Sequence, residues 1–148
     1  MSLDPLRLAE HAHGHLGWLA AAILAHPAIV LRNRRRRAHL AVGLATAFVT
    51  AASALGAFVY VAYRDRLRHE IFVTAPTIGF LMERKEHLAF GAVVLAWAGA
   101  AAYFAAPRAD APRRELLRTV AFRAFVCSAV LTLAVAILGT VVAVHRSF

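Results

Sequence analysis

The sequence predicts an all-α fold, an integral membrane four-helix up-down bundle that forms a single domain over residues 1–148. The first observation is composition, since 61% of the 148 residues are apolar and the mean hydropathy is +0.62. The second is that these residues form four blocks, each long enough for a helix that crosses about 30 Å of hydrocarbon. The third is that charged residues gather at the ends of the blocks. Because only helices and closed barrels satisfy their backbone groups in lipid, four such blocks indicate a helical bundle.

The four predicted spans follow one another along the chain. Their approximate bounds are residues 12–31, 38–63, 87–106 and 116–144. Pro27 lies one turn from the end of the first span and predicts a kink there. In the second span, Ala52 and Gly56 form a stripe of small residues, which allows a neighbouring helix to approach closely. Trp97 lies in the middle of the third span, where its indole N–H needs a hydrogen-bond partner inside the bundle.

Residues 64–86 form the longest stretch between predicted spans. They mix charged and apolar side chains, and Pro76 and Gly79 interrupt them. The segment is too short and too irregular to cross the membrane. We therefore predict a short outer interfacial segment between the second and third helices, folded back over one end of the bundle.

The distribution of charge predicts the orientation of the bundle. The first and third connections with their flanks hold ten cations against two acids, whereas the other side holds seven cations against six acids. Because cation-rich loops of membrane proteins stay in the cytoplasm, both termini are expected outside. The Ala- and Arg-rich composition is typical of bacteria, so we expect the bacterial inner membrane, with a periplasmic N-terminus and C-terminus. No basic face is interleaved with aromatic residues, which argues against nucleic acid as a partner.

Eight histidines are the main indication of chemistry. All of them lie near a predicted membrane boundary. Six fall on the outer side, and these are His11, His13, His15, His69, His87 and His145. His26 and His39 fall on the inner side. Histidine is tolerated at membrane interfaces, so a cofactor-free structural subunit with merely interfacial histidines remains an open interpretation.

A b-type haem held by two histidines needs imidazoles from different helices that face one another inside an apolar bundle. His15 and His26 are 11 residues apart, which places them within about 20° of one helix face. His15 and His87 begin helices that are diagonal in a simple bundle, and both lie at outer depth. His26 and His39 share the inner depth on neighbouring helices.

This layout resembles the four-helix membrane b-type cytochromes, the cytochrome b561-like group. The resemblance covers the four spans and is carried by boundary histidines, which are His15, His26, His39, His87 and His145. It implies haem b as the cofactor, one near the outer face and a second as an alternative near the inner face. It also implies electron transfer with quinone or a periplasmic redox protein, by an oxidoreductase or electron-transfer subunit whose catalytic residues are unknown. The sequence departs from the pattern because its second span lacks an outer histidine.

A single transition-metal ion bound directly at the outer face is the second hypothesis. Imidazole and carboxylate ligands suit zinc, iron or copper. The candidate ligands are His11, His13, His15, His69, Glu83 and His87. With one cysteine and two methionines in the chain, a dedicated Cu(I) site is disfavoured.

Four tyrosine and glutamate residues near the outer histidines are further candidates for function. Tyr60, Tyr63, Glu83 and Glu86 are candidates for an outer substrate or quinol site, and interfacial anchoring is the alternative role for them. No ionisable residue is expected deep in a span, which argues against an ion or proton pathway through the bundle. The lipid bilayer is the expected environment, and a homo-oligomer is an open alternative.

Overall fold

The computed structural model describes residues 5–33 and 38–145, and almost all of them are helical. The elements are α1 (Pro5–Arg32), α2 (His39–Arg66), α3 (Arg68–Thr74), α4 (Pro76–Ala105), the short 3-10 turn η1 (Ala106–Arg108) and α5 (Ala111–His145). Four helices in the described part are long and apolar enough to cross a membrane, namely α1, α2, α4 extended by η1, and α5. The predicted four-span all-α architecture is confirmed at this level. Residues 34–37, which contribute four of the predicted cytoplasmic arginines, lie outside the described residues.

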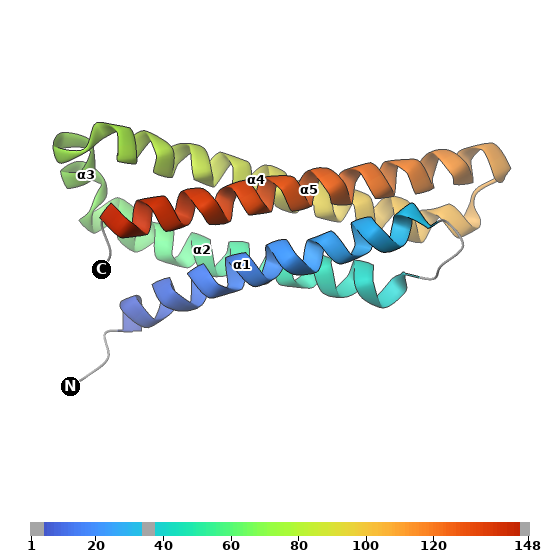
Figure 1. Ribbon diagram of the computed structural model, residues 1–148, viewed down its shortest axis with the longest axis horizontal. Helices are drawn as coiled ribbons and strands as arrows, with labels where there is room; N and C mark the ends of the chain where they lie inside the picture. The colour runs from blue at the N-terminus through green and yellow to red at the C-terminus, as the bar shows by residue number, and fades with distance from the viewer. Residues whose placement is uncertain (1–4, 34–37, 146–148) are drawn as a thin grey trace.

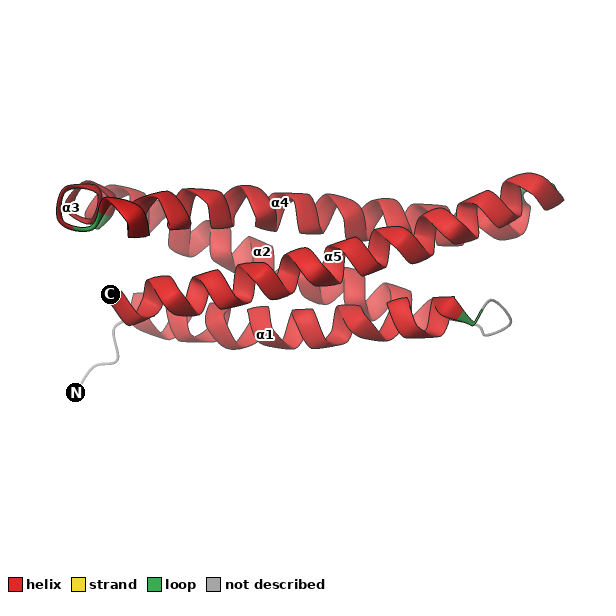
Figure 2. Cartoon of the chain, turned by 45° about the horizontal axis from the view of Figure 1, so that its top comes forward, coloured by secondary structure: helices red, strands yellow, loops and turns green. Residues whose placement is uncertain are grey.

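The four long helices lie alongside one another in an elongated bundle (Figure 1). α1 packs against α2 and α5, and α4 packs against the same two helices, so α1 and α4 are diagonal to each other. The first turns of α1, the last turns of α2 and α5, and all of α3 lie at one end of the bundle (Figure 1, Figure 2). We call this the α3 end. η1 lies at the opposite end.

The core is built from small residues that make room for a few large side chains. Phe125 of α5 is fully buried, and a Cβ placed on Gly99 of α4 would lie 3.0 Å from its ring. Ala96 and Ala100 of α4 are buried in the same cluster, together with Leu24 of α1. Small residues on α4 therefore determine how closely α5 approaches.

Hydrogen bonds between side chains and neighbouring helices tie the bundle together. The Ser128 hydroxyl of α5 donates to the Ala92 carbonyl of α4 over 2.7 Å. The indole N–H of Trp97 donates to the Thr50 hydroxyl of α2 over 3.1 Å, so the indole has a partner on a neighbouring helix, although Trp97 is 56% exposed and not inside the bundle. Such bonds stabilise helix pairs in lipid by about 1 kcal/mol each.

The third spanning helix begins at Pro76, about three turns earlier than its predicted start near His87. Proline ends a helix when it lies in the interior, but in the first turn its missing N–H is not needed. Gly79 does not interrupt the helix either. A Cβ at this position would lie 2.9 Å from the Phe72 ring of α3. This glycine instead lets α3 fold back onto α4. As a result, residues 83–87 belong to a helix that is long and apolar enough to cross a membrane, and not to a loop.

The predicted interfacial segment is reduced to α3, which lies across one end of the bundle (Figure 2). Ile71 is its buried residue and packs with Tyr63 of α2 and Met82 of α4. The Arg68 guanidinium donates from Nε to the Glu83 carboxylate of α4 over 2.9 Å. This hydrogen bond raises the pKa of Arg68 above its usual value. α3 is thus held by apolar contacts of Ile71 and Phe72 and by an exposed ion pair.

Replacing Phe125 with alanine removes the largest fully buried side chain of the bundle. We expect the free energy of unfolding to fall by roughly 3 kcal/mol, since the rigid small-residue walls cannot collapse into the cavity. The measurement is the thermal unfolding midpoint of the detergent-purified protein by circular dichroism. Phe58→Ala is the matched control, because Phe58 is 63% exposed on α2. Equal midpoints for the two variants would contradict the packing described above.

Candidate functional site

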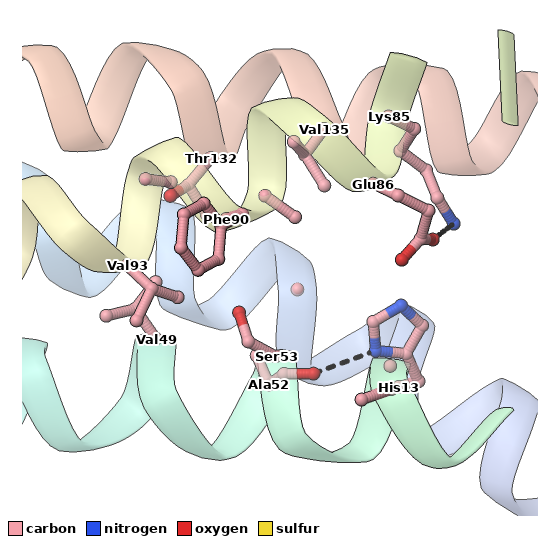
Figure 3. Close-up of a pocket in the computed structure, with 15 residues that line it drawn as sticks. His13, Val49, Ala52, Ser53, Lys85, Glu86, Phe90, Val93, Thr132 and Val135 are labelled. Atoms are coloured by element: carbon pink, nitrogen blue, oxygen red, sulfur yellow. Dashed lines mark hydrogen bonds and ion pairs between the residues drawn. The ribbon is translucent and has the colours of Figure 1, made fainter. Parts of the chain in front are cut away.

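A cavity of about 260 Å³ opens between the four long helices. Its walls are mostly apolar, with Val49, Phe90, Val93 and Val135 among the lining side chains (Figure 3). Its polar lining residues are His13, Ser53, Lys85, Glu86 and Thr132. A mainly apolar hollow with a few converging polar groups is the usual form of a small-molecule site.

Lys85 is the most unusual residue of this cavity. Its side chain is only 9% exposed, and its Nζ lies 3.8 Å from Oε1 of Glu86. Its aliphatic stem runs along Gly139 of α5, where an added Cβ would lie 3.7 Å from the Lys85 Cδ. Burying an ammonium is costly unless a counter-charge accompanies it. The counter-charges that accompany the amine are Glu86, the next residue of the same helix, and Glu10 of α1.

His13 of α1 lies opposite this pair (Figure 3). Its Nδ1 is 3.1 Å from the Ala52 carbonyl oxygen of α2. A carbonyl can only accept, so Nδ1 carries the hydrogen, and the Nε2 of the neutral ring is left as an acceptor. In Figure 3 the second ring nitrogen points toward Lys85 and Glu86. The site thus faces a ligand with an amine, a carboxylate and a basic ring nitrogen.

Gly56 of α2 makes this position of His13 available. A Cβ at Gly56 would lie only 2.6 Å from Cε1 of His13, which is closer than real atoms approach. The absence of a side chain therefore lets the imidazole reach the carbonyl of Ala52, one turn earlier on α2. The small-residue pair Ala52 and Gly56, expected to allow close helix approach, serves here to seat a polar ring.

The five predicted haem ligands all lie on the outer surface of the bundle, and these are His15, His26, His39, His87 and His145. The Nδ1 atoms of His87 and His145 contact carbonyls of their own helices, at 2.7 Å and 2.8 Å. α1 and α4 are diagonal as expected, but the structure does not turn His15 and His87 toward each other. These residues do not fit a haem held inside the bundle, and haem binding stays a prediction.

The predicted direct metal ligands are likewise dispersed. Within residues 5–33 and 38–145, no three His, Cys, Asp or Glu side chains gather into a group that could hold a metal ion. His11, His15, His69 and His87 are exposed, and Glu83 is bound to Arg68. His13 is the member of this set that lines the cavity. The metal-ion hypothesis also stays a prediction.

Lys85 and Glu86 are ionisable residues that sequence reasoning did not connect with a buried cavity. Both lie in the spanning helix α4, and Glu86 is the member of the predicted outer site that lines the cavity. Two signals in the sequence could have identified Lys85. It is the chain's single lysine among 17 cations. It also shares an i, i+4, i+7 face with Ala89 and Ala92, once α4 begins at Pro76.

Comparison with models of known protein families, with curated proteins and with solved structures finds no match to this chain. The resemblance to cytochrome b561-like proteins is therefore one of histidine pattern.

Replacing Gly56 with alanine should move His13 away from Ala52 with little change in stability, since the clashing atom ends a flexible side chain. The measurement is the ring ¹⁵N spectrum of histidine-labelled protein, with the His13 signals assigned from a His13→Asn variant. We expect the Nδ1 signal of His13 to shift or broaden. Gly43→Ala is the control, since a Cβ there meets nothing within 4 Å. An unchanged His13 signal in Gly56→Ala would contradict this account.

Proposed function

We propose that the chain is an integral protein of the bacterial inner membrane that binds a lipid-soluble small molecule in this cavity. The observation that carries the proposal is the meeting of His13, Lys85 and Glu86 within mostly apolar walls. Charged groups buried within a membrane helical bundle are costly and typically mark functional sites. The apolar walls would hold a ring or chain, and the three polar groups would hold an oxygen-bearing head.

A quinone of the membrane pool is the ligand class that we favour. Its carbonyl oxygens can accept a hydrogen bond from the Lys85 amine, and the hydroxyl groups of a quinol can donate to His13 Nε2 or to Glu86. The volume of about 260 Å³ lies just below the usual range of roughly 300–1,000 Å³ for ligand pockets. It suits one substituted ring with the start of its tail better than a macrocycle.

Replacing Lys85 with methionine should weaken binding of decylubiquinone by roughly 10- to 100-fold. The reason is the loss of one charge-assisted hydrogen bond, worth about 1.5–3 kcal/mol, while the volume of the side chain is kept. Isothermal titration calorimetry in detergent measures the change. Arg84→Met is the matched control, because Arg84 is the exposed neighbour on the same helix. Equal affinities of wild type and Lys85→Met for decylubiquinone would contradict the proposal that Lys85 binds the ligand.

Haem-based electron transfer with quinone or a periplasmic redox protein is the second candidate. The observation in its favour is the concentration of histidines toward one end of the bundle, with His11, His13 and His15 on α1, His69 on α3 and His145 at the end of α5. A b-type band in the reduced visible spectrum that His15→Ala and His87→Ala abolish would support it. A colourless protein with one bound metal ion per chain would support the metal hypothesis instead.

The proposal includes an up-down topology with both termini in the periplasm, as the charge distribution predicts. To test it, single cysteines replace His69 of α3 and Ala111 of α5 in a Cys127→Ala background. Both positions are exposed and lie at opposite ends of the bundle. A membrane-impermeant maleimide applied to spheroplasts should label His69→Cys at once and Ala111→Cys only after permeabilisation. The opposite labelling would place the termini in the cytoplasm.

A further inference from the structure

The chain uses a primary amine side chain at one position, and that position lies inside the cavity. Arginine supplies the cation at sixteen sites, and Lys85 is the only lysine. Where a side chain needs charge alone, as Arg68 does beside Glu83, the chain has arginine. A guanidinium stays protonated in proteins and is a poor nucleophile, whereas a lysine amine can add to a carbonyl carbon. The buried cation of the cavity is thus also the one with this reactivity.

The surroundings of Lys85 provide what such an addition requires. The Glu86 carboxylate, 3.8 Å from Nζ, can take a proton from the ammonium and free the nitrogen lone pair. His13, with its acceptor nitrogen directed toward the pair, offers a second place for the proton (Figure 3). The walls of the cavity are mostly apolar, and an apolar surrounding favours a condensation product that water would otherwise hydrolyse.

We propose that Lys85 captures a lipid-soluble aldehyde in this cavity as an imine. The amine nitrogen attacks the aldehyde carbon, a C–N bond forms, and the carbonyl oxygen becomes the hydroxyl of a carbinolamine. The proton held by Glu86 then returns to this hydroxyl, which leaves as water while the C=N bond forms. One aldehyde and one amine give one imine and one water, and no oxidant or reductant is needed. A protonated imine keeps Glu86 as its counter-ion.

This inference rests on the proposed cavity but requires chemistry that quinone binding does not. A hydrogen-bonded quinone needs only a donor at residue 85, whereas imine formation needs the primary amine itself. The apolar side of the cavity, with Phe90, Val93 and Val135, sets the class of aldehyde. The expected aldehyde has a hydrocarbon chain or ring next to its carbonyl and enters the cavity from the lipid.

The experiment treats the detergent-purified full chain with decanal and sodium cyanoborohydride, which reduces an imine to a stable secondary amine. Intact mass and peptide mapping then locate the decyl group and separate Lys85 from the N-terminal amine. We expect one decyl group on Lys85 in the wild type and none at residue 85 in Lys85→Arg. A wild type without modification of Lys85 would overturn the inference, whether or not any variant folds.

A position control separates the cavity from simple amine reactivity. The double variant Arg84→Lys with Lys85→Arg still has one lysine, now on the exposed neighbour. Modification of Lys85 in the wild type should be at least tenfold faster than modification of the relocated lysine in the double variant. Equal rates would show that the cavity contributes nothing and would overturn the inference.

Competition distinguishes this inference from the proposed function. Excess decylubiquinone should slow the trapping of decanal on Lys85 at least tenfold if both ligands use the cavity. If quinone does not change the rate at which Lys85 is modified, the imine proposal stands and the quinone proposal is contradicted. Quinone binding that depends on Lys85, without any decyl adduct, would overturn the imine and leave the quinone proposal standing.

Discussion

Close approach of helices at small residues is the constraint on which the rest of this structure depends. In lipid, helices associate through packing and hydrogen bonds, because the hydrocarbon around them is as apolar as their side chains. Gly99 makes room for the ring of Phe125, and Gly56 makes room for the ring of His13. The first contact fills space and holds α4 to α5. The second seats an imidazole against the Ala52 carbonyl, and the polar side of the cavity depends on it.

The four spans can be predicted from the sequence because apolar length alone defines them. The boundary of the third span cannot, because the effect of proline depends on where in a helix it lies. Pro76 indicates a break by its residue type and instead occupies the first turn of α4. That difference of about three turns places Lys85 and Glu86 on the same continuous helix as the predicted third span. Gly79 also indicates a break by its residue type, but it lies within α4 and allows the Phe72 ring to pack closely against this helix.

The predicted grouping of histidines shows a second limit of sequence reasoning. His15 and His26 do share one face of α1, as the helical angle requires, and both are exposed. Helical periodicity states which residues share a face but not whether that face points to lipid or to the core. His13 lies two residues before His15, about 200° around the helix, so an outward His15 directs His13 inward. The inward direction of His13 is set by α2, where the small residues Ala52 and Gly56 leave space for its ring. The sequence of α1 alone does not show this space, because it depends on how the two helices pack.

The two ion pairs of α4 show why the cavity is suited to binding. Arg68 and Glu83 come from different helices and meet at 2.9 Å near the surface, so each satisfies the other. Lys85 and Glu86 are consecutive on one helix, where side chains diverge by about 100°, and their charged atoms approach only to 3.8 Å. This pair is therefore longer than the Arg68–Glu83 pair, although Lys85 is buried. A ligand oxygen placed between them and His13 would add a closer hydrogen bond to this long ion pair, so the local geometry of the helix itself favours an occupant for the cavity.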